Sequence, residues 1–339
     1  MTPRGALRWA GAVGLGAMAA AVTRRPVRFG VAHQTGLVHA VSFRTVLGAL
    51  TAGTAGMAVV GRRALRRPVL SFTAGAVAAL SAGVAAGSVA ALAEQGWAGH
   101  ALPRRATASG EPDVVVLLLN TLMGAADAPA IVERAVAEDA TVLALPECPA
   151  VLAAAVVDGL AAHGRRMQSF GTRENLWPTG ETWLLVDERL GRYRQVDAPE
   201  MQLGAAVAEP DGHDGPTLAA VHPPAPMTLV GLGAWRTYVP AAVDVARSRP
   251  NAIVAGDFNT TLDHEPMADL APYVDAATMV GRGAEGTWPA RIPALLATPI
   301  DHVLVRPEVW TVLGTRTYRV GDSDHRAVVA RLARTRIVS

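Results

Sequence analysis

The chain has 339 residues, of which 50% are hydrophobic types and 18% are charged. Its mean hydropathy of +0.25 excludes a disordered protein, and so few charged residues are unusual for an ordinary soluble protein of this length. The one cysteine, Cys148, excludes an intramolecular disulfide framework and a four-cysteine zinc site.

The net charge of +2 combines two parts of opposite sign. Residues 1–111 contain 12 Arg and two Glu, a net charge of +10, and residues 112–339 contain 19 Arg against 27 Asp and Glu, a net charge of −8. Such asymmetry indicates a membrane or nucleic-acid contact in the basic part. The hydropathy of that part favours the membrane.

Three apolar segments occupy the first third of the chain. Residues 6–22 are apolar apart from one Arg, and residues 45–61 and 68–93 carry no charge. A helix needs about 20 apolar residues to cross the hydrocarbon core of a bilayer. We therefore predict a membrane domain of residues 1–93 with three transmembrane helices, of which the third meets this length best.

The first apolar segment has an alternative interpretation. Basic residues Arg4 and Arg8 precede or begin it, as in a secretory signal peptide, and removal of such a peptide would leave two spans. The short loop at 62–67 has the densest cluster of Arg and should lie in the cytoplasm by the positive-inside rule. The chain beyond residue 95 is then expected outside the cytoplasmic membrane.

Composition changes again after the apolar segments. Residues 94–111 have the Pro, Ser and Gly content of a linker, and residues 112–335 are expected to form one α/β domain. Short apolar runs predict strands at 114–119, 141–145, 181–186, 217–221, 251–255 and 300–305. Helical spacing predicts helices at 127–139 and 236–248. Strands that alternate with helices indicate a layered α/β architecture.

Polar residues follow the ends of these predicted strands, where α/β sheets place their sites. In chain order they are Asn120, Glu147, His222, Asp257, Asn259, Asp301, Asp324 and His325. The last five belong to the motifs GDFN at 256–259, IDHV at 300–303 and SDH at 323–325. Each residue alone could serve a turn or a helix terminus, but the ordered set is hard to explain in that way.

The order of these motifs resembles the endonuclease/exonuclease/phosphatase superfamily over about residues 112–335. The resemblance implies a DNase I-like, four-layer α/β sandwich with two packed sheets, and a metal-dependent phosphoesterase. The apolar segments, with HPPAP at 222–226 and TWP at 287–289, look like the membrane-anchored actinobacterial branch. That branch includes VanJ-type proteins, which are linked to dephosphorylation of undecaprenyl pyrophosphate. Pro146 and Trp183 depart from the family pattern without removing a site residue.

A hard divalent cation prefers carboxylate and amide oxygens. On the resemblance, we expect Mg²⁺, with Mn²⁺ as the alternative ion, to be bound by Glu147, Asn120 and Asp324. Such a metal polarises the phosphoryl oxygen and neutralises charge on the leaving group.

The other polar residues are expected to handle the attacking water and the phosphate. Asp257 is the candidate to orient or deprotonate the water, with Asn259 holding that water or a phosphate oxygen. His222 and His325 are expected at the phosphate. Asp301 is expected to fix the tautomer of His325.

Three residues next to the predicted site residues or within the motifs receive structural interpretations. His302 is expected to face away from Asp301, because successive side chains on a strand alternate. Trp288 is assigned to core packing in preference to a wall for an isoprenoid chain. Cys148 is expected to be a small buried side chain.

The acidic domain disfavours nucleic acid as a substrate, because affinity for nucleic acid depends mainly on Lys and Arg and the chain has no Lys. A phosphorylated lipid in the bilayer is the preferred substrate. The alternatives are an extracytoplasmic nuclease, a phospholipid phosphodiesterase and an inactive membrane-tethered binding module. The last is disfavoured because Glu147, Asp257 and His325 are all present.

Overall fold

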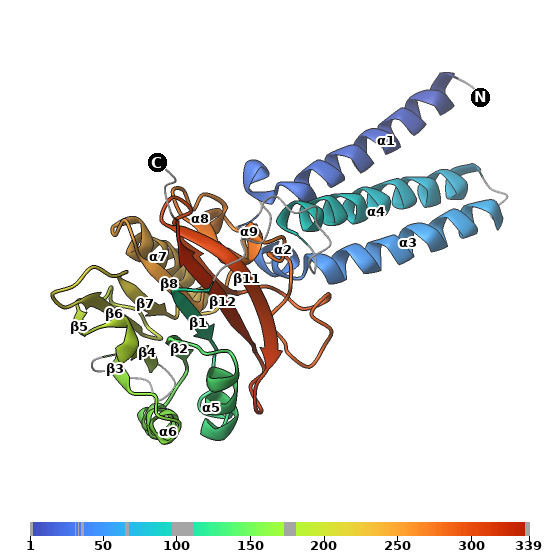
Figure 1. The fold of residues 1–339 in the computed structure, drawn as a ribbon. Coiled ribbons are helices and arrows are strands. Elements are labelled where there is room, and N and C mark those ends of the chain that lie inside the picture. Colours follow the sequence, from blue (N-terminus) through green and yellow to red (C-terminus); the bar gives the residue numbers. More distant parts are fainter. Residues whose placement is uncertain are drawn as a thin grey trace. The chain divides into compact units, whose positions relative to one another are not determined.

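The computed structural model describes residues 3–30, 32, 34, 37–64, 68–96, 111–172 and 181–335. The chain divides into a helical unit within residues 1–95 and an α/β unit that contains both β-sheets (Figure 1). Most of the predicted linker lies outside the described residues.

The helical unit has its long helices where the sequence predicts apolar segments. They are α1 (Pro3–Arg24), α3 (Arg44–Ala64) and α4 (Pro68–Gln95), and a short helix, α2 (Leu37–Ser42), precedes α3. Helix α4 packs against both α1 and α3. Within the described residues, Phe72–Gln95 is the one helical segment that is long and apolar enough to cross a membrane.

Glycines allow α1 and α4 to approach closely. A Cβ at Gly83 would lie 2.0 Å from the carbonyl oxygen of Gly16, and a Cβ at Gly16 would lie 2.6 Å from that of Ala79. Small residues at a helix interface let the two backbones come together, which is typical of helices that pack in lipid. The Gly content of α4 is therefore a packing requirement.

We expect Gly83→Ala to destabilise the helical unit by about 1–3 kcal/mol, because the added methyl group overpacks against the α1 backbone. Gly53→Ala is the matched control, since nothing lies within 4 Å of a Cβ at that position of α3. There Ala should be neutral or favourable, because it is a better helix former than Gly. Thermal unfolding of the full-length protein in detergent measures both variants, and equal midpoints would contradict the close packing.

The α/β unit contains two mixed six-stranded sheets with helices on their outer faces, which confirms the expected two-sheet α/β sandwich. Sheet A has the order β11–β12–β1–β2–β4–β3, and sheet B has the order β5–β6–β7–β8–β10–β9. The strands are β1 (Val114–Leu118), β2 (Val142–Pro146), β3 (Met167–Gly171), β4 (Thr182–Asp187), β5 (Tyr193–Val196), β6 (Ala205–Pro210), β7 (Leu218–Val221), β8 (Ile253–Asp257), β9 (Val274–Asp275), β10 (Asp301–Val305), β11 (Trp310–Arg319) and β12 (Arg326–Arg334). The helices are α5 (Ala128–Ala137), α6 (Ala150–Ala162), α7 (Leu229–Arg247), α8 (Glu265–Ala268) and α9 (Ala276–Met279).

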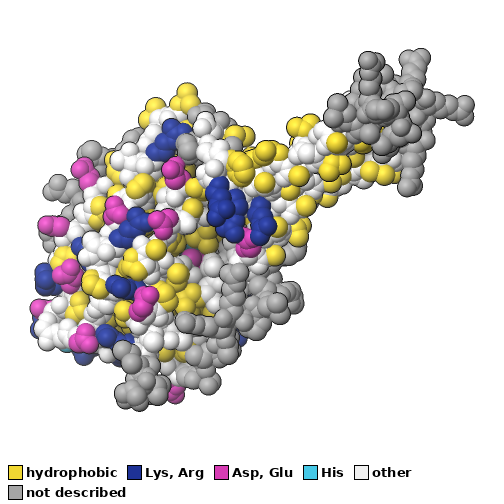
Figure 2. Space-filling view, turned by 90° about the horizontal axis from the view of Figure 1, so that it is seen from above, with side chains coloured by type: hydrophobic (Ala, Val, Ile, Leu, Met, Phe, Trp, Pro, Cys, Tyr) yellow, Lys and Arg dark blue, Asp and Glu magenta, His cyan; other side chains and the backbone are white. Residues whose placement is uncertain are grey.

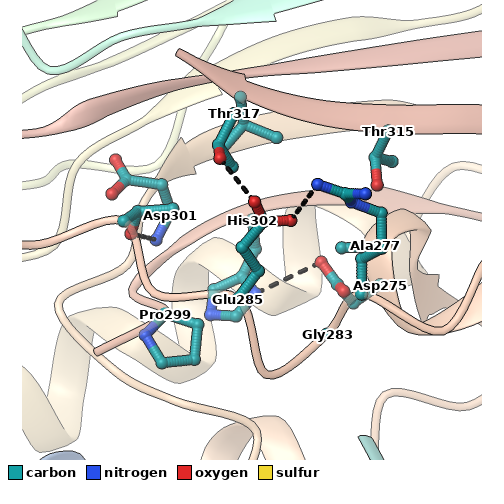
Figure 3. A pocket seen from close by; sticks show the side chains of 12 residues that line it. Asp275, Ala277, Gly283, Glu285, Pro299, Asp301, His302, Thr315 and Thr317 are labelled. Atoms are coloured by element: carbon teal, nitrogen blue, oxygen red, sulfur yellow. Dashed lines mark hydrogen bonds and ion pairs between the residues drawn. The ribbon is translucent and has the colours of Figure 1, made fainter. Parts of the chain in front are cut away.

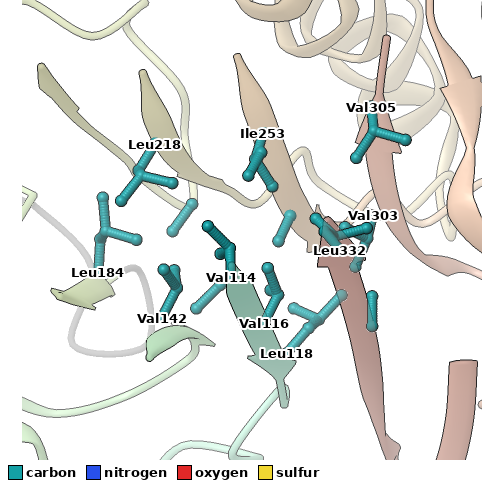
Figure 4. Packing of buried hydrophobic residues seen from close by; sticks show 14 of the residues in the cluster. Val114, Val116, Leu118, Val142, Leu184, Leu218, Ile253, Val303, Val305 and Leu332 are labelled. Atoms are coloured by element: carbon teal, nitrogen blue, oxygen red, sulfur yellow. The ribbon is translucent and has the colours of Figure 1, made fainter. Parts of the chain in front are cut away.

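Strand β1 is apolar throughout because both of its faces are buried. Val114, Val116 and Leu118 belong to the core between the two sheets, and Figure 4 shows them among the strands of both sheets. Val115 and Leu117 point the other way, into the core shared with α5 and α6. This alternation is the normal consequence of strand geometry, and it makes β1 a central element of the sandwich.

Side-chain caps set where α5 and α7 of the α/β unit begin. Asp127 Oδ1 accepts a 2.7 Å hydrogen bond from the Ala130 N–H at the start of α5, close to the predicted start. Thr228 caps α7 in the same way by accepting from the Gly231 N–H. Helix α7 therefore begins at Leu229, earlier than the predicted residue 236, because glycine in its first turns weakens the sequence signal.

Strand directions bring the predicted site residues to one edge of the sandwich. The pairs β1–β2 and β7–β8 are parallel, so the carboxyl ends of the two strands in each pair lie together. Strands β12 and β10 run antiparallel to β1 and β8, so their first residues lie at the same edge. The polar residues that follow or begin these strands can therefore meet.

Candidate active site

His222 and Asp257 are neighbours because β7 and β8 pair in register. Val221 lies opposite Gly256, and a Cβ at Gly256 would lie 2.1 Å from the carbonyl oxygen of Val221. Only glycine permits such a close approach. One residue farther along, His222 Nε2 lies 3.5 Å from Asp257 Oδ2. The glycine of GDFN thus positions an imidazole beside a carboxylate.

Asn120 joins two carboxylates that come from different sheets. Its Nδ2 donates to Glu147 Oε1 and to Asp257 Oδ2, each at 3.0 Å. Its Oδ1 accepts from the Leu122 backbone N–H at 2.9 Å, which fixes the orientation of the amide because only the oxygen can accept that bond. The nitrogen therefore faces the other site residues, and ligation of a metal through the oxygen stays a prediction.

Glu147 and Asn259 occupy sharp turns directly after their strands. Their φ angles are +54° and +50°, in the left-handed region that residues other than glycine rarely adopt. Thr121 Oγ1 donates to the Glu147 carbonyl oxygen at 2.6 Å and so supports the first turn. Backbone strain of this kind is often found at active sites, and here it belongs to two of the predicted site residues.

The predicted pair of His325 and Asp301 is hydrogen-bonded. His325 Nδ1 donates to Asp301 Oδ2 at 2.9 Å, and His325 Nε2 lies 3.7 Å from Asp257 Oδ2. Both Asp301 and Asp257 are buried. The contact with Asp301 places a proton on Nδ1 and leaves Nε2 directed toward the centre of the site.

Burial and neighbouring charges change the pKa values of these groups. Burial lowers the pKa of His325, but the carboxylates of Asp301 and Asp257 outweigh it and raise the pKa to about 10. Burial raises the pKa of Asp257, but His325 and His222 outweigh it and lower the pKa to about 2. Burial raises the pKa of Asp301, His325 lowers it, and nearby Asp257 adds to the rise, so that the pKa is raised. At neutral pH, an imidazolium therefore lies beside ionised Asp257.

We expect Asp301→Asn to move the alkaline limit of activity to lower pH. The wild-type imidazolium of His325 is present below its pKa of about 10 and is lost as the pH rises through that value. Without the Asp301 charge, this pKa falls toward the ordinary value of about 6.5, and the proton is lost earlier. A pH profile of kcat/KM measures the shift, with Asp211→Asn as an exposed control. An unchanged alkaline limit would show that Asp301 does not determine the pKa of His325.

Asp324 is held by an aromatic residue that the sequence assigned only to core packing. Trp288 is half-buried, and its Nε1–H donates to Asp324 Oδ2 at 2.8 Å. The other Asp324 oxygen is buried without a hydrogen bond to the described residues. Trp288 therefore also orients a carboxylate of the site, and its presence in the TWP motif was the available signal.

Two hydroxyl groups that the sequence reading missed support the site from behind. Ser323 Oγ donates to the Asn120 carbonyl oxygen at 2.6 Å and accepts from the His325 N–H at 3.0 Å. Thr287 Oγ1 accepts from the Asp301 N–H at 3.3 Å. Both residues lie inside the recognised SDH and TWP motifs, so the motifs contain positioning residues as well as reactive ones.

The side chains of β10 alternate as the sequence predicts. Asp301 bonds to His325, whereas His302 contacts Asp275 Oδ1 at 3.2 Å and the Thr260 carbonyl oxygen at 2.9 Å. Asp301 and His302 are both among the residues that line a small cavity (Figure 3). Its volume is about 20 Å³. A volume of this size accommodates one water molecule. The cavity is too small for a phosphorylated substrate and lies behind the reacting groups.

The side chains present fit a divalent metal. Ligand atoms of Asp257, Asp301 and His325 lie within 4.8 Å of one another, a set that differs from the predicted ligands. Within this set, Asp301 and His325 already bond to each other. The more exposed carboxylates are Glu147, with 22% of its side chain accessible, and Asp324, with 35%. Accessible carboxylates suit a cation that keeps part of its water shell. Asp324 Oδ1, which accepts no hydrogen bond from the described residues and lies 3.9 Å from His325 Nε2, fits such a partner.

Comparison with known proteins identifies relatives of the α/β unit. The model of the Endonuclease/Exonuclease/phosphatase family matches residues 117–325. No curated protein gives a significant match to the chain. Among solved structures, D. rerio TDP2 humanized by 14 mutations is 14% identical, with 65% of this chain and 98% of that chain covered and a TM-score of 0.50. An endonuclease/exonuclease/phosphatase from Beutenbergia cavernae DSM 12333 is 18% identical, with 66% and 72% covered and a TM-score of 0.49. A mannosyl-6-phosphatase from Bacteroides thetaiotaomicron VPI-5482 is 14% identical, with 65% and 100% covered and a TM-score of 0.46.

Proposed function

The chain belongs to the endonuclease/exonuclease/phosphatase family, and from this premise we propose that it is a membrane-anchored phosphoesterase whose substrate is a phosphorylated membrane lipid, such as undecaprenyl pyrophosphate. Members of the family are metal-dependent phosphoester hydrolases, so the class of reaction follows from membership. The lipid substrate, the anchor and the choice of Mg²⁺ belong to the proposal.

We assign the metal to Glu147 and Asp324, with Asn120 as the third predicted ligand. Carboxylate and amide oxygens are the donors that Mg²⁺ prefers, and it commonly uses only one or two protein carboxylates. When bound, the ion polarises a phosphoryl oxygen and neutralises charge on the leaving group. Trp288 supports this site because it donates to Asp324 and limits the rotation of that carboxylate.

Asp257 orients the attacking water. Its pKa of about 2 keeps it ionised throughout the physiological range, so it can accept a hydrogen bond from the water and orient it. The Asn259 N–H donates to Asp257 Oδ1 at 2.9 Å, and Asn120 donates to Oδ2 at 3.0 Å, so both oxygens of the carboxylate are fixed.

The two imidazoles serve the phosphate. His325 is protonated at neutral pH and can donate from Nε2 to a phosphate oxygen or to the leaving group. His222 is fully buried, and its Nε2 lies 3.8 Å from Glu147 Oε1 and 3.5 Å from Asp257 Oδ2. It therefore lies beside both carboxylates, and its contact with the phosphate is part of the proposal.

The apolar exterior of the helical unit is the observation that supports a lipid as the substrate. No charged residue occurs in 9–23, 45–61 or 72–93. Large side chains on these segments are more than half exposed, namely Val13, Leu15, Met18, Leu50, Met57, Val60 and Val89. Figure 2 shows hydrophobic side chains along these helices. A surface of this kind is unfavourable in water and suits a bilayer. An enzyme anchored in this way meets lipid substrates directly.

Phosphate release by the full-length protein tests this proposal. The detergent-solubilised protein is incubated with Mg²⁺ and either undecaprenyl pyrophosphate or linear DNA, and His325→Ala provides the blank. We expect the lipid to release phosphate and the DNA to remain intact, because the α/β part has a net charge of −8 and no Lys. Cleaved DNA with untouched lipid would make the protein an anchored nuclease instead.

We also propose that the α/β unit lies outside the cytoplasm, on the basis of the Arg cluster at 62–67. Protease added to intact cells should then cleave within residues 112–335. Protection of this region until the cells are lysed would reverse the orientation.

A further inference from the structure

The exposed large hydrophobic side chains of the α/β unit share one location. Among its described residues they are Met123, Val151, Met227, Leu229, Val230 and the pair Leu295–Leu296. Met123 follows β1, Val151 follows β2, the next three follow β7, and the pair precedes β10. These are the segments that carry Asn120, Glu147, His222 and Asp301, so the exposed apolar groups lie at the edge of the sandwich that holds the active site.

The segment after His222 is the most exposed of these. Met227, Leu229 and Val230 expose 73%, 76% and 84% of their surface, in the last part of the loop and the first turn of α7. Three largely exposed apolar side chains within four residues are costly in water, at about 25 cal/mol for each Å² that could be buried. A surface of this kind marks a contact with an apolar partner.

The charge of two of these segments, the one after His222 and the one before β10, restricts that partner. Residues 223–243 and 286–300 contain Arg236 and Arg291 and no Asp or Glu, within a part of the chain that carries −8 overall. Both Arg residues are exposed. Apolar side chains flanked by exposed cations are complementary to an anionic lipid surface, where the apolar groups enter the acyl boundary and the cations meet the headgroups.

We propose that residues 223–236 and 286–300 form a lipid-docking rim, through which the α/β unit binds the surface of an anionic bilayer. This inference rests on the proposed membrane location and adds a second contact with lipid, made by the catalytic unit itself. Because the rim borders His222 and Asp301, docking places the phosphates of the bilayer at the entrance of the active site. The enzyme then attacks its substrate without extracting the lipid from the membrane.

A fluorescent label at the rim tests the proposal. Leu229→Cys in the full-length protein is labelled with an environment-sensitive maleimide dye and reconstituted in nanodiscs of equal amounts of phosphatidylcholine and phosphatidylglycerol. Burial raises the pKa of the Cys148 thiol to about 12, so the introduced thiol is the one that reacts. Asp211→Cys is the matched control, because Asp211 is exposed in the turn before β7, whereas His222 follows the other end of that strand.

The readout is quenching by doxyl-labelled lipid. Residue 229 should lie about 5–10 Å into the headgroup and acyl boundary, so its dye should lose most of its fluorescence, whereas a dye at residue 211 should lose little. Equal quenching at the two positions would contradict the proposal of a lipid-docking rim. No substrate is present, so the result is independent of lipid hydrolysis. Failure of the protein to co-elute with the nanodiscs would contradict the proposed anchor, whereas co-elution with an unquenched dye at 229 contradicts only the rim.

Discussion

Replacing Glu147 by Ala is expected to abolish metal-dependent turnover while the fold and the membrane fraction are retained. The Glu147 carboxylate is the accessible acidic group that faces Asn120 and His222. A metal that stabilises a phosphoryl transition state contributes several kcal/mol, which corresponds to a loss of about 10³-fold in rate. The measurement is kcat as a function of Mg²⁺ concentration, with near-ultraviolet circular dichroism as the check on folding.

Glu209→Ala provides the control for this variant. Glu209 pairs with Arg194 where β6 ends, and the active site lies at the opposite ends of the strands of sheet B. It should behave as the wild type. If Glu147→Ala retained the wild-type response to Mg²⁺, the metal would be held by other residues. The group of Asp257, Asp301 and His325 would then be the first alternative.

Asp257→Asn is expected to lower kcat by about 10²–10⁴-fold, the usual effect of removing a group that assists proton transfer. Asn keeps the size of the side chain and can still accept from the Asn259 N–H, but it lacks the charge that faces His222 and His325. Binding of a substrate analogue should change much less than kcat. Asp244→Asn, at an exposed carboxylate on α7, is the control and should leave both quantities unchanged. If Asp257→Asn lowered kcat only a few-fold, another group would orient the attacking water.

The sequence predicts the strands that consist of continuous apolar runs. β1, β2, β4, β7, β8 and β10 form where continuous apolar runs occur, because only such runs satisfy a strand between a second sheet and a helical layer. The missed strands lack this pattern. β6 contains Ala, Glu and Pro, which are poor strand formers. β5 and β12 carry Arg; β5 pairs with β6 at the margin of sheet B, and β12 lies in sheet A through pairing with β1, far away in the sequence.

Helix α6 shows the opposite difficulty. Its residues, Ala150–Ala162, are so uniformly apolar that no period of 3.6 can be recognised, although the helix buries a defined face through Leu152, Val156 and Leu160. Periodicity identifies a half-buried helix, and a helix with few polar residues escapes it. Its place in the fold is fixed by tertiary packing, which no local pattern contains.

The active site was predictable as a set of residues and less so as an arrangement of atoms. Motif order gave Asp257 and His325, because reactive groups recur at strand ends. It could not show that Asn120 directs its nitrogen to both carboxylates, since that depends on a bond between its oxygen and the Leu122 N–H. Nor could it pair Trp288 with Asp324, which lie 36 positions apart and meet only in the folded chain.

The position of β12 has a consequence for the synthesis of the enzyme. Asn120 and Glu147 follow β1 and β2 in sheet A, and the third contributor from this sheet, His325, directly precedes β12, which must insert beside β1. A growing chain therefore contains Asn120 and Glu147 long before His325 reaches them. We therefore expect partly translated chains to be inactive, and hydrolysis to begin only when β12 has paired with β1.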